Sequence, residues 1–461
     1  MQSLFWIILF IAPVWVALNR DYQRGLCNAL VLFALMPSTL RISVGSAFEF
    51  TFQRVLLILV LGYWIRWIAS RGRPLKIPFI RIVAAWWVAN LLSLIFSPDK
   101  GLSLKWFVSF STEIVLFYVI VSTSLTDAAS LMGAFRALCV SSAIIALLGA
   151  VEYYTQFNPV LQWMGILEPG KAEGDVVATF RHRILFGYSA AMGWPLLLAL
   201  AQRLHRQAAS VGVVFVAMLA IAGAYFSNSR GPWFAVPIAG VILLVLATRR
   251  MRRTVLVFCL LAVVVLVARP GVRATVYDLV MTTNDPDSYR GGSYEYRKEL
   301  WPVAFDLAGS SPVRALFGHG GQSTETMDLH SRFEYGGSTF NIGYSSWDNN
   351  YACDLVEFGY VGLSIEVVFY VCILAALSRS AVRCRDPWRD VAVACLAATV
   401  VYMFALTNVY MFSPQLKCMF MTLITIGARL PILASEGDEE PMAGTADEAG
   451  SRAPCCAAET A

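Results

Sequence analysis

The stretch Trp347-Asp348-Asn349-Asn350-Tyr351 closes a polar segment, residues 271–350, in a sequence that is otherwise mostly apolar. Apolar segments of membrane-spanning length stand on both sides of it. The polar segment also contains Arg297 and the run Phe317-Gly318-His319-Gly320-Gly321. Ordering so long a loop costs conformational entropy, and long loops in compact proteins are commonly functional. We therefore expect this segment to cover an active site.

The composition indicates a membrane protein. Of the 461 residues 57% are hydrophobic and 15% are charged, against about 25% charged residues in soluble domains. Mean hydropathy is +0.61. The ten cysteines form no C-x-x-C pair, which argues against a disulfide framework and a zinc site. The sequence has no Walker loop and no G-x-G-x-x-G motif, so neither a nucleotide-driven pump nor a nucleic-acid partner is expected.

Apolar segments predict an all-α polytopic membrane protein with 12 or 13 transmembrane helices. A bilayer core needs about 20 apolar residues per helix. The first and last segments are the weakest, and the first is interpreted as a span because no small-residue cleavage site follows it. The segments are 4–18, 25–42, 52–69, 78–97, 104–124, 130–156, 184–202, 210–226, 232–248, 254–268, 352–377, 390–408 and 411–430.

The basic residues between these segments predict their orientation. They fall in every second connection, as expected of the cytoplasmic side: Arg20/Arg24, Arg71/Arg73/Lys76, Arg203/Arg206, Arg249/Arg250/Arg252/Arg253 and Arg379/Arg383/Arg385/Arg389. The polar loop, and a shorter loop at 157–183, are then external. The predicted organisation is an N-terminal bundle (1–270), the external loop (271–350), C-terminal helices (351–430) and a disordered cytoplasmic tail (431–461).

Arginines on the external side are candidates for binding an anion. Arg230 lies in a tight turn at the start of a span, where backbone N–H groups and the helix dipole already favour negative charge. A guanidinium adds a planar fork that matches phosphate oxygens. Arg181, His182 and Arg183 precede another span and depart from the positive-inside trend. The alternative for each is an interfacial side chain that reaches the lipid headgroups.

Within the long loop, residues 294–307 predict an amphipathic helix with Arg297 on its first turns. Glycines around His319 allow close backbone approach. A surface helix and a turn that only cover the spans are the simpler interpretation of these features.

The end of the loop offers a carboxylate and an amide. Asp348 or Asn349 can cap the following helix, or Asp348 can act as a general base on an incoming hydroxyl with Asn349 as a positioning partner. Within spans, Glu113 and Glu366 are functional candidates, although pairing with an arginine would also explain them. Four aromatic residues are candidates for stacking on sugars or for anchoring at the interface: Tyr296, Trp301, Trp347 and Tyr351.

Four segments together resemble the O-antigen ligase and Wzy-type polysaccharide polymerase superfamily. They are Thr179-Phe180-Arg181-His182; Ser229-Arg230-Gly231-Pro232-Trp233; Arg297, Leu300-Trp301 and Phe317-Gly318-His319-Gly320; and Asp348-Asn349-Asn350-Tyr351 through Glu357-Phe358-Gly359 and Gly362. No single motif is specific, but the ordered set around one long loop is fairly specific.

The resemblance implies a GT-C-like helical fold and a metal-independent glycosyltransferase without a cofactor, in the bacterial cytoplasmic membrane. Its donor is a glycan on undecaprenyl diphosphate, held by Arg230 and Arg297 with Arg181 or Arg183. An acceptor glycan, the lipid bilayer and other polysaccharide assembly proteins are the implied partners, and His319 is a further candidate for contact with substrate.

The resemblance favours a polymerase over a ligase. Ligases carry a histidine where this chain has Asp348, and an Asp-Asn start is more similar to the exopolysaccharide polymerase branch. Transfer to lipid A core by a ligase, and transport by a flippase, remain the alternatives. A flippase would predict paired interrupted spans and charges near the bilayer midplane, which the sequence does not show.

Overall fold

The computed structural model describes residues 2–44, 48–71, 76–165, 174–283, 285, 289–327, 334–335, 338–339, 347–385, 388–411 and 413–439. Almost all of these residues are helical. The elements are α1 (Gln2–Arg20), α2 (Tyr22–Leu35), β1 (Arg41–Val44), β2 (Phe48–Thr51), α3 (Phe52–Ala69), α4 (Ile80–Phe96), α5 (Lys100–Phe110), the π-helix η1 (Ser111–Leu116), α6 (Phe117–Ser124), α7 (Ala128–Thr155), α8 (Pro159–Met164), α9 (Arg183–Arg203), α10 (Gln207–Phe226), α11 (Arg230–Leu246), α12 (Arg249–Ala268), α13 (Pro270–Thr283), α14 (Tyr289–Gly309), α15 (Pro312–Phe317), the 3₁₀ helix η2 (Ser323–Glu325), β3 (Glu334–Tyr335), β4 (Ser338–Thr339), α16 (Asn350–Arg383), α17 (Arg389–Leu406) and α18 (Pro414–Glu439).

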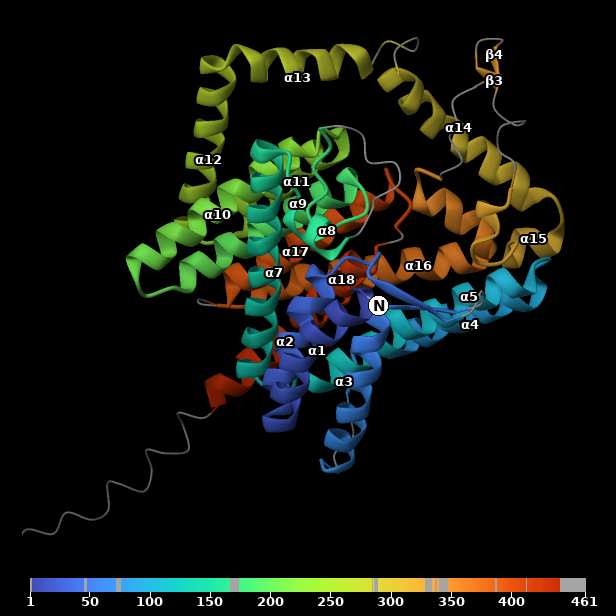
Figure 1. The fold of residues 1–461 in the computed structure, drawn as a ribbon, viewed down its shortest axis with the longest axis horizontal. Coiled ribbons are helices and arrows are strands. Elements are labelled where there is room, and N and C mark those ends of the chain that lie inside the picture. Colours follow the sequence, from blue (N-terminus) through green and yellow to red (C-terminus); the bar gives the residue numbers. More distant parts are fainter. Residues whose placement is uncertain are drawn as a thin grey trace, which may run out of the picture.

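The structure confirms an all-α polytopic membrane protein. In its described part, nine helical segments are long and apolar enough to cross a bilayer, and α4 and α11 are shorter apolar helices. In α9 and α17 most of the apolar stretch is buried, 89% and 83%, whereas in α12 only 17% is buried. The bundle is therefore centred on α9 and α17, while α12 stands at its edge (Figure 1).

Three sequence predictions need correction. The span expected at 25–42 ends as helix α2 at Leu35, because Pro37 follows and the chain turns into the antiparallel β1–β2 hairpin. The loop helices are not all short, since α14 has 21 residues. Helix α18 continues through Pro431 to Glu439, whereas the sequence predicts a disordered tail from residue 431.

Helices α12, α13 and α14 form an arch over one end of the bundle (Figure 1). Helix α12 rises from the bundle, α13 crosses above it, and α14 returns toward α15 and α16. The predicted amphipathic helix is present within α14, and Leu300, Ala304 and Leu307 face the core that α14 shares with α16. We call the end of the bundle beneath this arch the loop end.

Helix α16 is broken at Gly359, and the break receives the glycine run of the loop. Gly359 has φ 66° and ψ −172°, which interrupts the helical ladder. The freed carbonyls of Val356 and Glu357 accept hydrogen bonds from the backbone N–H groups of His319 and Gly320, both at 2.9 Å. The structure confirms the predicted close approach of the glycine run to another backbone segment, because a Cβ on Gly318 would overlap the backbone of Glu357.

Candidate functional site

Three helices begin close together at the loop end. Helix α9 begins at Arg183, α11 at Arg230 and α16 at Asn350. A Cβ on Gly187 of α9 would lie 2.6 Å from Pro232 of α11, so these two N-terminal turns are in direct contact. The carboxylate that precedes α16, Asp348, is close enough to His182 to influence its charge. Each N-terminus carries partial positive charge, and together they favour an anion.

An ion pair joins the arch to the start of α16. Arg297 of α14 donates from Nη2 to Oδ2 of Asp348 at 2.6 Å. Both side chains are largely buried, with exposed fractions of 20% and 19%. A charge-assisted bond in a half-dry site is stronger than a surface pair, so it holds both side chains in place. The structure thus brings together two site residues that lie 51 positions apart in the chain.

Tyr188 connects the Arg230 turn to Arg297. Its hydroxyl packs on Gly231, where a Cβ would overlap it, and its ring is buried. The positive charge of Arg297 also acts on this hydroxyl. Sequence reasoning missed Tyr188 because it lies inside an apolar span, and only its position six residues after His182 hinted at a role.

The predicted Arg181 and Arg183 lie at the same end of the bundle. Arg183 pairs with Asp175 at 2.9 Å, and Arg181 is exposed. Among the described residues, four arginines and two aspartates lie at this end of the bundle: Arg181, Arg183, Arg230 and Arg297, with Asp175 and Asp348. Guanidinium groups beside helix N-termini suit an anion such as a diphosphate.

His182 caps helix α9. Its Nδ1 accepts a hydrogen bond from the backbone N–H of Ile184 at 3.2 Å. Partial desolvation by the surrounding protein lowers the pKa of His182, whose side chain keeps an exposed face, and the neighbouring Arg183 lowers it further, against smaller opposite effects of Asp348 and Asp175. The imidazole is therefore neutral at pH 7 and able to accept the bond, which a protonated ring cannot do.

Replacing His182 by asparagine is expected to remove a pH dependence of stability. Because the folded pKa lies below the unfolded value of about 6.5, the cap stabilises fully above that pH and is lost as the pH falls through the folded pKa. An asparagine side chain would cap at every pH, so H182N should be more stable than wild type at pH 5 by about 1 kcal/mol. Thermal unfolding in detergent between pH 7.5 and 5 measures this, with H205N as the control. Equal pH slopes for H182N and wild type would contradict the assignment.

Asn349 and His319 have structural partners. Asn349 is the N-cap of α16, and its side chain accepts from Ala352 N at 3.1 Å. His319 places Nε2 3.1 Å from the carbonyl oxygen of Leu307, which ties the glycine run to α14. Asn349 thus acts on the site by fixing the first turn of α16, next to Asp348.

The aromatic candidates divide into two groups. Tyr296 and Trp347 are 1% and 3% exposed and belong to the core between α14 and α16, so they do not present a face to a sugar. Their burial follows from the amphipathic packing of α14, which places Tyr296 one turn before Leu300 on the same face. Trp301 is partly buried beside Phe305, and Tyr351 donates its hydroxyl to the Met403 carbonyl at 3.2 Å.

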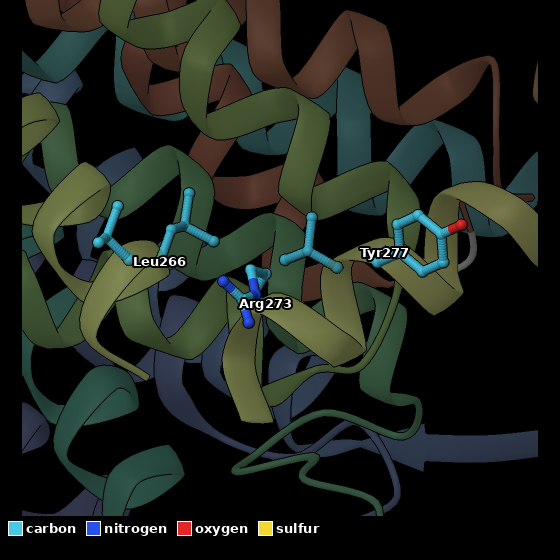
Figure 2. Close-up of a pocket in the computed structure, with 5 residues that line it drawn as sticks. Leu266, Arg273 and Tyr277 are labelled. Atoms are coloured by element: carbon cyan, nitrogen blue, oxygen red, sulfur yellow. The ribbon is translucent and has the colours of Figure 1, made fainter. Parts of the chain in front are cut away.

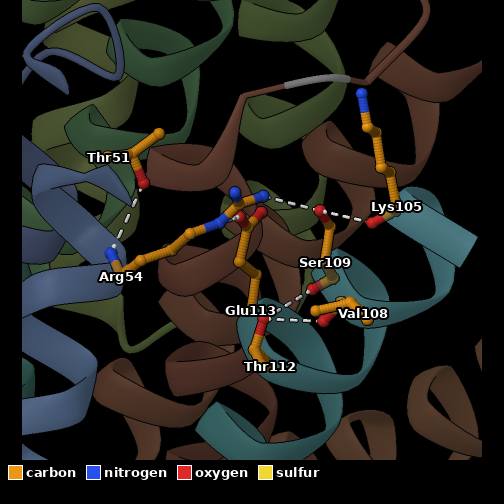
Figure 3. A network of polar contacts seen from close by, with 7 residues as sticks. All are labelled: Thr51, Arg54, Lys105, Val108, Ser109, Thr112 and Glu113. Atoms are coloured by element: carbon orange, nitrogen blue, oxygen red, sulfur yellow. Dashed lines mark hydrogen bonds and ion pairs between the residues drawn. The ribbon is translucent and has the colours of Figure 1, made fainter. Parts of the chain in front are cut away.

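Glu113 is paired with an arginine, as one of the two sequence interpretations expected. Arg54 of α3 donates from Nε to Glu113 at 2.9 Å and from Nη2 to Ser109 at 2.6 Å (Figure 3). Glu113 lies in the π-helix η1, and such a turn widens the helix and re-aims its side chains.

A surface groove of about 440 Å³ lies at the corner between α12 and α13 (Figure 2). Leu266, Val267 and Val276 line it together with Arg273 and Tyr277. A ligand-binding pocket has several polar groups that converge on the ligand, whereas this groove has one charged side chain among mostly aliphatic ones. The groove is therefore a poorer candidate than the arginine cluster beneath the arch.

The fold and the site define a polytopic α-helical membrane protein with a cluster of arginines and helix N-termini at one end of the bundle. Residues 215–367 match the family model described as O-antigen ligase, Wzy_C. This region runs from α10 to α16 and contains Arg230, Arg297 and Asp348. It confirms the predicted resemblance to the O-antigen ligase and Wzy-type superfamily and supports a glycosyltransferase-like activity of the ligase or polymerase type. A search of curated proteins finds no match.

Proposed function

We propose that this protein polymerises undecaprenyl-diphosphate-linked oligosaccharide units into an exopolysaccharide or O-antigen-like polymer on the outer face of the bacterial cytoplasmic membrane. The observation that carries the proposal is the arginine cluster at the starts of α9 and α11, bridged to the arch by the Arg297–Asp348 pair. A lipid-linked diphosphate at the bilayer surface is the anion that such a site at a helical membrane bundle suits best.

The reaction places new charge where the arginines lie. A hydroxyl of the acceptor glycan attacks the anomeric carbon of the donor, and the bond from that carbon to the diphosphate oxygen breaks. The departing diphosphate gains negative charge, which Arg230 and Arg297 stabilise with the help of Arg181 and Arg183. Preorganised cations of this kind lower the barrier because they do not have to reorganise during the reaction.

Asp348 would position the acceptor at the opposite side of the anomeric carbon. A carboxylate has about four lone-pair sites, so Asp348 can accept from the acceptor hydroxyl while it is paired with Arg297. Asn349 keeps this carboxylate at the mouth of the site by capping α16. Trp301 and Tyr351 remain candidates for contact with sugars.

A ligase is the second candidate, because the matched family model is described as O-antigen ligase. Polymerase and ligase share the donor chemistry and differ in the acceptor. We favour the polymerase because Asp348 stands where ligases carry histidine.

Purified protein in liposomes should convert an undecaprenyl-diphosphate-linked oligosaccharide into longer glycans without any nucleotide and in the presence of a chelator. The expected products are a polymer ladder and one released undecaprenyl diphosphate per linkage formed, measured by gel and mass spectrometry. Growth only when lipid A core is added would favour the ligase. Movement of intact donor across the bilayer without release of undecaprenyl diphosphate would overturn the enzyme assignment.

A further inference from the structure

A second polar centre lies inside the bundle, behind the start of α16. It is a cavity of about 40 Å³ lined by residues of α4, α5, η1, α16, α17 and α18. At roughly 10–15 Å³ per water, this volume holds about three water molecules and is far smaller than the hundreds of Å³ of a typical ligand pocket. Asn350, two residues after Asp348 in the chain, lines it.

Two carboxyl groups of α16 meet at this cavity. Asp354 and Glu366 are 6% and 2% exposed, and both line this cavity. Two ionised carboxylates at one small buried cavity repel each other, so we take the pair to hold one proton. Asn350 Nδ2 donates to Asp354, and the Tyr370 hydroxyl donates to Glu366 at 2.7 Å. These donors fix the two carboxyl groups on the wall of the cavity.

A buried ammonium group points to polar content in the same cavity. Lys417 of α18 is 8% exposed and lines the cavity, and its Nζ lies 5.0 Å from the centre of the Trp106 ring. Among the described residues, this cation–π contact is the side-chain contact that the structure shows for Lys417. An ammonium group at a small polar cavity suits water that accepts from Lys417 and donates to the carboxyl pair.

The proposed glycosyl transfer needs a destination for a proton. When the acceptor oxygen bonds to the anomeric carbon, its hydrogen must leave. Asp348 already accepts a hydrogen bond from Arg297 at 2.6 Å, so part of its accepting capacity is taken. The carboxyl groups further along α16 are a second candidate destination for the proton.

We propose that the Asp354–Glu366 pair takes up the proton released by the acceptor hydroxyl, through water held in the cavity beside Lys417. This inference rests on the proposed glycosyltransferase function. The carbon–oxygen bond to the acceptor forms, the bond to the diphosphate oxygen breaks, and the diphosphate leaves with the electron pair. The proton passes from the acceptor oxygen to water and from water to the carboxylate of the pair, which becomes doubly protonated. After the product leaves, the proton returns to the solvent.

Several charged and titratable groups lie around the Asp354–Glu366 pair, and each contributes to the electrostatic potential at the two carboxyl groups. Lys417 of α18 is the cation that compensates the singly protonated pair. Helices α4 and α5 contribute only uncharged side chains to the cavity wall. The other groups include Glu113 of η1, Tyr402 of α17, Tyr410 in the α17–α18 connection, Cys418 of α18, and Tyr351, Cys353, Glu357 and Tyr370 of α16.

The test compares the pH dependence of turnover in D354N, E366Q and D354N/E366Q, all full-length and in liposomes with the lipid-diphosphate oligosaccharide. The double variant should lose about 100-fold in kcat, the lower end of general-base effects, with donor binding unchanged. The E366Q variant keeps one carboxylate, that of Asp354, but loses its coupling to a second one. The acidic limb of its profile of turnover against pH should therefore move by about one unit or more. D127N is the control, since it replaces a carboxylate that caps α7 and does not line the cavity.

The experiment distinguishes failure of the proton-acceptor role from failure of the proposed glycosyltransferase function. If wild-type protein releases no undecaprenyl diphosphate, the glycosyltransferase assignment fails. If wild type turns over but the double variant stays within about threefold of it with the same acidic limb, the proton-acceptor role is overturned. Should the double variant fold poorly by thermal unfolding, the pH profile of E366Q decides, because a purely structural role would lower yield without moving the limb.

Discussion

Arg297→Ala and Arg230→Ala should each reduce polymer formation by about 10³-fold while the protein remains in the membrane. The physical reason is that each variant removes a fixed cation from the oxygen atoms that gain charge as the diphosphate leaves, and the loss of one such group commonly costs about 10²–10³ in rate. Polymer length by gel and initial rates of undecaprenyl diphosphate release measure the effect. R273A is the matched control, because Arg273 is an exposed arginine of the same loop that lies on α13.

Arg297 also supports the fold, and a second variant separates the two roles. In R297A the carboxylate of Asp348 loses its partner in a site where it is only 19% exposed, so stability should fall as well. The double variant R297A/D348N removes both charges and should recover much of that stability but no activity. Polymer of wild-type length in R297A/D348N or R230A would contradict the diphosphate assignment.

Replacing these arginines by lysine tests whether the site needs the planar guanidinium group or only its positive charge. R297K keeps the positive charge but replaces the planar fork by a single ammonium, so bidentate contact with a phosphate is lost. We expect an activity between those of wild type and R297A, and lower affinity for the donor. Equal activities of R297K and wild type would show that charge alone is sufficient.

The helices were predictable because their signals are local. Apolar runs of spanning length, the spacing of Leu300, Ala304 and Leu307, and the turn before Arg230 are all read within a few neighbouring residues. Helix ends were less predictable. Pro37 shortened α2, and Pro431 did not end α18, because a proline inside a helix removes one hydrogen bond and neighbouring residues decide whether the helix continues.

The pairings in the site were not predictable, because they depend on tertiary packing. Nothing near Asp348 in the sequence indicates that Arg297 lies 2.6 Å away, and the sequence alone left Asp348 as either a helix cap or a general base. Asp354 and Glu366 lie 12 positions apart on one helix, and the break between them changes which faces meet. As aromatic residues, Tyr296 and Trp347 were candidates for stacking on sugars, yet the packing of α14 against α16 buries them.

Gly359→Ala is expected to destabilise the protein more than any other single change proposed for α16. A backbone at φ 66° and ψ −172° is adopted almost exclusively by glycine, which alone puts the cost at about 3 kcal/mol. The new Cβ would also lie 2.5 Å from the backbone carbonyl of Leu316, so α15 would have to move. Thermal unfolding and the yield of folded protein in detergent measure the loss.

Gly240→Ala is the matched control, because Gly240 lies inside helix α11 and a Cβ there meets nothing within 4 Å. That change should leave the protein as stable or raise its stability by about 0.5–1 kcal/mol. If G359A instead unfolds within about 2 °C of wild type, the break is not a strained position that the fold depends on. The expected loss would show that α16 is broken because the carbonyls of Val356 and Glu357 receive the glycine run. The same break separates the part of α16 that follows Asp348 and carries Asp354 from the part that carries Glu366.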